Sequence, residues 1–201
     1  MAVVSGGTTL IDNGALDAGV STGSLILLST QTASASASIE FTTGIDSTYD
    51  SYVFKFINIH PQTDTVYFQM NLSTDGGSTY NVTKTTTFFR AQHLENGVAS
   101  VFEYVGAEDL AQSTSAQVIN NLMGADADQN VSGYMQIFNP SSSTFVKHFI
   151  SVVNSTFTDS EASANLYMAG YGNTTSPINS IKFEMSSGNI DDGIIKMYGV
   201  K

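Results

Sequence analysis

The sequence predicts an all-β protein: an antiparallel, jelly-roll-like β-sandwich of about ten strands with an N-terminal arm. Apolar and polar residues alternate with period 2 through most of the chain after residue 23, as in Tyr52, Phe54 and Phe56. Glycine, proline and asparagine separate the alternating segments, as expected of turns. Long segments with the apolar period of 3.6 that a helix requires are absent from the sequence.

The predicted strands follow one another at short intervals. Residues 25–28 form an apolar run that is typical of a short buried strand. Further strands are expected at residues 39–42, 52–59, 66–72, 85–91, 101–105, 134–137, 145–153, 166–170, 178–185 and 194–200. In residues 145–153 either face fits a buried position, because both carry apolar side chains. Residues 106–130 look least strand-like, and residues 107–111 or 116–123 are candidates for a helical turn.

Composition predicts one folded domain with a separate N-terminal segment. A chain of 201 residues suits a single all-β domain. Residues 1–23, which contain the glycine-bearing runs 5–7 and 19–23, are predicted to be an arm for docking or oligomerisation, or else a loosely held terminus. Residues 24–201 are the predicted β-sandwich domain. The chain has no cysteine, which excludes disulfides and thiolate metal sites.

The charge balance argues against two classes of partner. The net charge is −11, with only seven lysines and arginines. Nucleic-acid binding depends on clustered basic residues, and the sequence has no such cluster. An electrostatic attraction to anionic membranes is disfavoured for the same reason. We expect no secretory signal and no membrane span, since the longest apolar run is residues 25–28.

Two stretches resemble the letters of functional motifs. Residues 19–23 match the pattern of a nucleophile elbow, but a strand follows them where that motif requires a helix. Residues 126–130 copy the start of a calcium loop, but Val131 and Ile137 occupy the positions that need glycine and glutamate. An irregular calcium site remains an alternative to a solvated loop there. The same two interpretations apply to Asp75, Asp191 and Asp192.

The remaining candidates for chemistry are scattered. His60, His93 and His148 lack the short paired spacing that is typical of zinc ligands. Carboxylates of the kind that act in glycoside cleavage occur throughout, and the sequence singles out no pair. They are Glu40, Glu95, Glu103, Glu108, Asp109, Glu161 and Glu184. Tyrosines can stack on sugars or anchor an interface, with ordinary packing as the alternative for each. We therefore assign no catalytic, cofactor-binding or metal-ligating residue.

Three stretches carry a resemblance to a known group of proteins. Residues 49–54 (Tyr-Asp-Ser-Tyr-Val-Phe) and 73–80 (Ser-Thr-Asp-Gly-Gly-Ser-Thr-Tyr) resemble virion β-sandwich proteins of marine tailed bacteriophages, both tail-fibre-like and capsid-decoration-like. Residues 187–199, which end Lys-Met-Tyr-Gly, are similar to the closing strand of that group. The likeness covers most of residues 24–201 and combines a strand, a glycine-rich hairpin and a closing strand.

The resemblance implies a non-enzymatic bacteriophage virion structural protein without a cofactor, most simply a short tail fibre or spike module in host attachment. It also implies a homotrimer, located in the virion, that contacts other virion proteins through the N-terminal arm and a host surface glycan. A capsid decoration protein, such as a cement protein or head fibre, is the alternative. A glycan-degrading virion enzyme is the second alternative.

Overall fold

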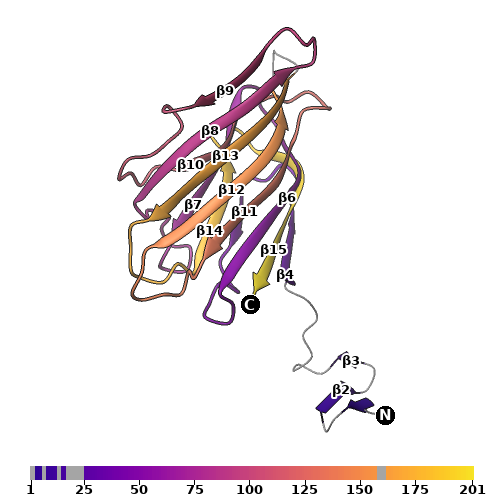
Figure 1. Ribbon diagram of the computed structural model, residues 1–201, viewed down its shortest axis with the longest axis vertical. Coiled ribbons are helices and arrows are strands. Elements are labelled where there is room, and N and C mark those ends of the chain that lie inside the picture. The colour runs from indigo at the N-terminus through magenta and orange to yellow at the C-terminus, as the bar shows by residue number, and fades with distance from the viewer. Residues whose placement is uncertain (1–2, 6–7, 13–14, 17–24, 158–161) are drawn as a thin grey trace.

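Two antiparallel sheets face each other in the computed structural model, which describes residues 3–5, 8–12, 15–16, 25–157 and 162–201 (Figure 1). The four-stranded sheet has the order β10 (Gln117–Met123), β7 (Val66–Ser73), β14 (Ser180–Met185) and β5 (Ser38–Phe41). The eight-stranded sheet has the order β4 (Ile26–Thr32), β15 (Ile190–Val200), β6 (Ser51–Pro61), β11 (Val131–Phe138), β12 (Lys147–Thr156), β13 (Ala162–Gly172), β8 (Lys84–Leu94) and β9 (Ser100–Tyr104). The predicted antiparallel β-sandwich is confirmed.

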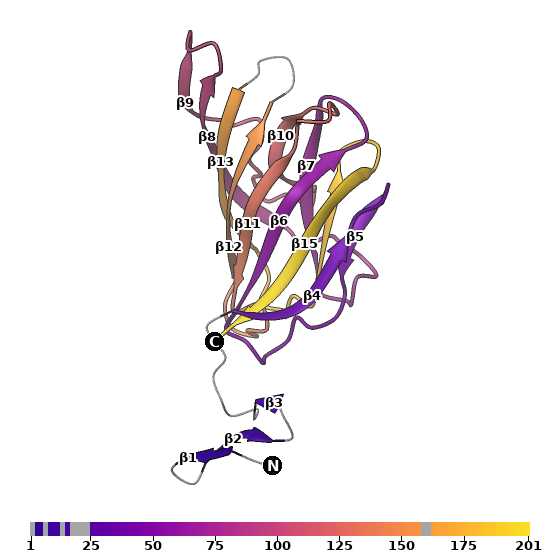
Figure 2. The ribbon, with the colours of Figure 1, turned by 90° about the vertical axis from the view of Figure 1, so that its right-hand side faces the viewer.

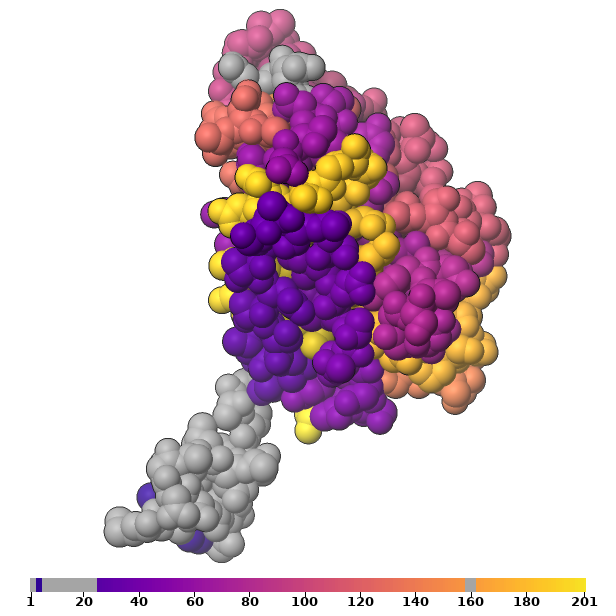
Figure 3. Space-filling view, turned by 180° about the vertical axis from the view of Figure 1, so that it is seen from behind, coloured from indigo at the N-terminus to yellow at the C-terminus, as the bar shows by residue number. Residues whose placement is uncertain are grey.

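The chain alternates between the two sheets as it does in a jelly roll (Figure 2). β5, β7, β10 and β14 lie in the smaller sheet, and the strands between them in sequence lie in the larger one. The larger sheet departs from the eight-strand pattern in two ways. A meander of β11, β12 and β13 replaces a single strand, and β15 with β4 extends one edge. Seen from behind, early strands in indigo lie beside C-terminal strands in yellow, which agrees with the β4–β15 and β5–β14 pairs (Figure 3).

A third, small sheet lies near the N-terminus. It consists of β1 (Val3–Ser5), β2 (Thr8–Asp12) and β3 (Ala15–Leu16), which pair in that order. Within the described residues these strands pair only with one another and with no strand of the sandwich. The predicted role of residues 1–23 in docking or oligomerisation stays a prediction. The predicted elbow at residues 19–23 lies outside the described residues.

Phenylalanine rings fill the space between the sheets. Phe183 of β14 lies at the centre, with ring centroids 5.2 Å from Phe56, 5.4 Å from Phe54 and 5.9 Å from Phe68. Phe41 packs against Phe54 at 5.3 Å. All five rings are buried, which confirms the inward faces predicted for residues 52–56 and 66–72. The strands β6 and β7 are therefore not neighbours in one sheet but face each other across the core.

The alternation of buried and exposed side chains shows which face of the larger sheet is exposed to solvent. In β12, Lys147, Phe149 and Ser151 are buried while His148 and Ile150 are exposed, so the ambiguous face of residues 145–153 is decided. Phe145 lies before this strand and is 68% exposed. β11, β13 and the second half of β15 alternate in the same way. One side of the eight-stranded sheet thus packs on the core and the other faces solvent.

Three predictions of local structure are wrong. Residues 116–123 hold no helical turn, because Gln117–Met123 is β10, an almost wholly buried strand. Residues 25–28 are not a buried strand, since β4 is an edge strand and Leu27 is 52% exposed. The glycine-rich turn at residues 73–80 does not close a hairpin, because β7 and β8 lie in different sheets. Within the described ranges, no helix has the length and apolar character that a membrane crossing needs.

Candidate ligand-binding face

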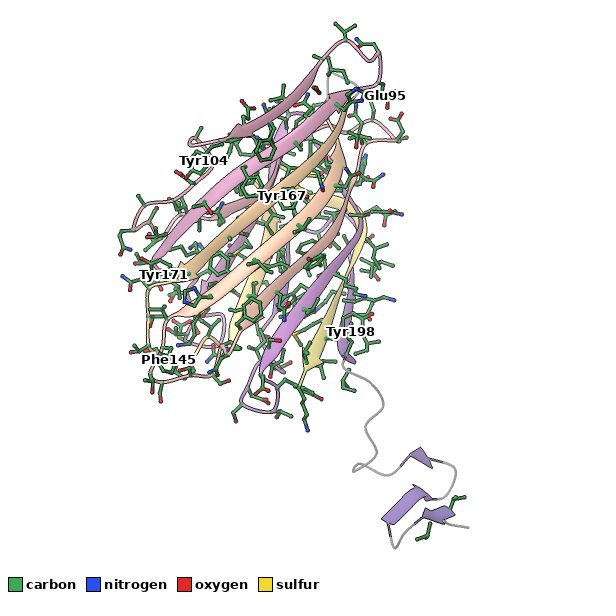
Figure 4. All side chains as sticks on the ribbon, in the orientation of Figure 1. Glu95, Tyr104, Phe145, Tyr167, Tyr171 and Tyr198 are labelled. Carbon is green, nitrogen blue, oxygen red and sulfur yellow. The ribbon has the colours of Figure 1, made fainter. Side chains whose placement is uncertain are left out.

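The outward side chains of β8, β9, β12 and β13 form one continuous surface, which we call the outer aromatic face (Figure 4). Its members alternate along each strand with side chains that point to the core or its edge. They are Thr85, Thr87, Phe89, Ala91 and His93; Ser100, Phe102 and Tyr104; His148, Ile150, Val152 and Asn154; and Ser163, Asn165, Tyr167, Ala169 and Tyr171. Phe102 is 78% exposed and Tyr104 is 58% exposed.

An aromatic ridge crosses this face at right angles to the strands. The register places Tyr104 beside Phe89 and Phe89 beside Tyr167. The rings of Phe89 and Tyr167 are stacked, with centroids 4.8 Å apart and planes inclined by 6°. Phe102 packs edge-on against Phe89 at 5.8 Å. Such cross-strand aromatic pairs stabilise a sheet and give the exposed rings a fixed position.

Small side chains on both sides of the ridge create two shallow depressions. On one side, Ala169 and Gly170 lie between the ridge and the His148–Tyr171 ring pair, in a depression of about 310 Å³. On the other side, Ala91 and Asn165 lie in a depression of about 340 Å³ that Phe102 also lines. The corrugation follows from the sequence, because β8 and β13 place alanine two residues after a ridge ring.

The outer aromatic face is uncharged although the protein carries a net charge of −11. None of its members is a carboxylate, a lysine or an arginine. Arg90 and Glu103 of β8 and β9 point to the other side of the sheet and pair with each other at 2.6 Å. Tyr104 at the rim donates a hydrogen bond to the Asp109 carboxylate, and this bond raises the pKa of the tyrosine.

Hydrogen bonds within the face orient its polar groups. Asn165 Nδ2 donates to the Tyr167 hydroxyl at 2.8 Å, which leaves that hydroxyl able to donate outward. Asn154 Nδ2 donates to Ser163 Oγ at 3.1 Å. The hydroxyls and amides thus sit at the margins of an apolar surface. Concave apolar surfaces with a few placed polar groups are typical of small-molecule sites.

The structure places the three predicted histidines in separate parts of the protein. His93 pairs in register with Ser163 and His148 with Tyr171, at opposite ends of β13. His60 lies elsewhere, with its Nε2 3.1 Å from the Asp126 carbonyl oxygen. Within the described residues, no group of three histidine or acidic side chains is placed to hold a metal ion.

Asp75 has a structural function in the turn after β7. Its carboxylate accepts hydrogen bonds from Ser73 Oγ and Thr79 Oγ1, each at 2.6 Å, and from the Thr79 amide at 2.9 Å. These bonds lower the pKa of Asp75 to about 2. Gly76 and Gly77 follow with φ of 75° and 87°, a conformation that favours glycine. The turn therefore needs both the carboxylate and the glycines for its shape.

The other acidic candidates have separate neighbours in the described part of the chain. Glu40 accepts a bond from the Tyr80 hydroxyl at 3.1 Å, and Glu184 pairs with Lys182 at 2.9 Å. Glu108 accepts from Asn121. Glu161 lies outside the described residues. Glu40, Glu108 and Glu184 do not belong to the outer aromatic face.

Sequence reasoning did not identify the ridge. Phe89 was placed in a strand, and Tyr167 was one of nine tyrosines with no distinguishing feature. The local signal is the alternation of an aromatic residue with alanine in each strand. What the sequence lacks is the pairing of β8 with β13, which brings the two rings together.

Comparison with known proteins finds no relative, so a proposed function has to be based on the fold and the outer aromatic face. No family model, no curated protein and no solved structure matches the chain.

Proposed function

We propose that the chain is a non-enzymatic structural protein of a tailed-bacteriophage virion, a short tail fibre or spike module that attaches the particle to its host. The supporting observation is the outer aromatic face. Soluble proteins seldom expose a contiguous apolar surface unless it binds something. Here the exposed ring of Phe102 and the half-buried rings of Phe89 and Tyr167 are held by cross-strand pairing on a sheet whose other side packs on the core.

The fold is compatible with this proposal. Jelly rolls occur in viral capsid proteins and in lectin domains. Fold alone does not decide a function, so this compatibility is an analogy. The resemblance of residues 49–54 and 73–80 to bacteriophage virion proteins points the same way.

The N-terminal segment supplies the proposed contact with the particle. Within the described residues, β1, β2 and β3 pair only with one another, so they are not part of the sandwich. We propose that it docks on other virion proteins and supports a homotrimer. The same observation favours the second candidate function, capsid decoration, in which the segment would bind the capsid lattice.

Binding to host cells tests attachment directly. Fluorescently labelled full chain should bind cells of the host strain saturably in flow cytometry and should not bind a strain that resists the phage. Heat-unfolded chain is the control for non-specific adhesion. Absence of saturable binding to host cells would contradict the attachment function.

Copy number separates a fibre from a decoration protein. Quantitative mass spectrometry of purified virions should find the chain at the low copy number of a tail component. A copy number comparable with that of the major capsid protein would contradict the tail location and support decoration.

A further inference from the structure

We infer that the outer aromatic face binds an uncharged saccharide chain, with sugar rings in the two depressions and the Phe89–Tyr167 ridge between them. The inference rests on the proposed attachment function and names the ligand class of the same face. Sugars present apolar C–H faces and hydroxyl rims, so they pack on aromatic side chains and hydrogen-bond at their margins. The ridge and its polar surroundings offer both kinds of contact.

The sizes of the two depressions and their order along the strands match successive sugar rings of a saccharide chain. Their volumes of about 310 Å³ and about 340 Å³ lie at the small end of ligand sites. Each depression begins one outward position from the ridge, at Ala169 on one side and at Ala91 on the other. A saccharide running along β8 and β13 would therefore meet a depression, a ridge and a second depression in turn.

The polar groups that line the depressions are hydroxyls, amides and imidazoles. The depression beside Ala91 is lined by Ser100, Ser163, Asn165 and His93. The one beside Ala169 is lined by Thr85, Thr87, His148 and Tyr171. These groups donate and accept hydrogen bonds with sugar hydroxyls.

The absence of charged side chains from the two depressions indicates which class of saccharide they bind. No lysine or arginine lines either depression to balance a sulfate or carboxylate. The net charge of −11 would in addition repel a polyanionic glycan. Both features favour a neutral saccharide over an acidic one.

Calorimetric titration of the full chain tests the inference. The probes are neutral gluco-, manno- and galacto-oligosaccharides, with a sulfated galactan as the anionic comparison. We expect at least one neutral oligosaccharide to bind and the sulfated galactan not to bind. Binding of the sulfated galactan alone, or of no saccharide, would overturn the inference.

Variants locate the site. Tyr167→Ala removes one of the two stacked rings of the ridge, and Ala169→Trp fills one depression from the solvent side. Each should lower the affinity for the oligosaccharide about tenfold or more. Tyr167→Ala removes an aromatic ring on which a sugar packs, and Ala169→Trp occupies the space of a sugar ring. Tyr198→Ala is the matched control, since Tyr198 is a half-buried outward tyrosine on β15 of the same sheet. Thermal unfolding monitored by circular dichroism should show that all three variants are folded. Equal affinities for all variants would overturn the site.

Two further results separate the ligand class from the proposed function. If the chain binds host cells but no neutral oligosaccharide competes, the saccharide inference fails and attachment stands. If neutral oligosaccharides bind through the ridge but host cells are not bound, the inference stands and attachment fails.

If Tyr167→Ala instead dissociates an oligomer in light scattering, the face is a contact between copies and the inference is overturned.

Discussion

Lys84 Nζ of β8 lies 2.6 Å from Asn71 Oδ1 of β7, which joins the eight-stranded sheet to the four-stranded sheet inside the protein. The lysine is fully buried, and its other acceptor is the Val82 carbonyl oxygen at 2.9 Å. Both acceptors are neutral. Burial without a carboxylate partner lowers the pKa of Lys84 to about 8 from its ordinary 10.5. Lys84 therefore lies at a buried position where the charged form of its side chain is disfavoured.

This burial predicts a rise in stability at alkaline pH. Between about pH 8 and 10 the unfolded chain holds the Lys84 proton and the folded chain does not, so the free energy of unfolding increases with pH. The shift from 10.5 to about 8 corresponds to at most about 3 kcal/mol. Urea unfolding at several pH values up to about 9.5 measures this increase in the free energy of unfolding. Higher pH is avoided, because burial raises the pKa of Tyr52 and Tyr80 and this opposes the rise.

Lys84→Met should reduce this pH dependence, and the part that remains is expected from Lys147, whose pKa burial also lowers. Lys55→Met, which changes an exposed lysine of β6, should leave the pH dependence as in the unmodified chain. The same slope in Lys84→Met and the unmodified chain would show that Lys84 is not the responsible group.

Asp75→Asn tests the turn after β7. The carboxylate has a lowered pKa, so the stability that it contributes is present above its ordinary pKa of 3.8 and is lost as pH falls toward about 2. We expect the variant to have a lower melting temperature than the unmodified chain at pH 7 and a smaller difference near pH 2. Asp50→Asn serves as the control, because Asp50 is an exposed aspartate. A difference that stays constant with pH would contradict this account of Asp75.

Phe183→Ala tests the core. Its ring contacts those of Phe41, Phe54, Phe56 and Phe68, so truncation opens a cavity between the sheets. The free energy of unfolding should fall by about 3–5 kcal/mol in chemical denaturation. Phe145→Ala removes an exposed ring of the same type and should change stability by less than about 0.5 kcal/mol. Similar losses in the two variants would contradict the assignment of Phe183 to the centre of the core.

Local alternation predicted the fold because each strand of a half-exposed sheet marks its buried face. Phe54 and Phe68 show this, since each belongs to an alternating apolar set in a predicted strand and each is buried. The same logic failed for β10, where buried Gln117, Asn120 and Asn121 interrupt the apolar pattern. Polar residues that are buried by tertiary contacts look like loop residues in the sequence.

The outer aromatic face could not be predicted from the sequence because it depends on pairing between distant segments. Phe89 and Tyr167 each look like ordinary strand residues, and only the register of β8 with β13 stacks them. One depression likewise needs Ala91 beside Asn165, and the other needs Ala169 beside Thr87. Periodicity reports which side of a strand faces outward but not which strands are adjacent.

Competition for adsorption tests attachment through the outer aromatic face most directly. Host cells are incubated with saturating purified chain before the phage that carries it is added, and free phage is counted over time. The unmodified chain and Tyr198→Ala should slow adsorption, whereas Phe89→Ala combined with Tyr167→Ala should not. Unchanged adsorption in the presence of the unmodified chain, or equal inhibition by the ridge variant, would contradict the proposed role of this face.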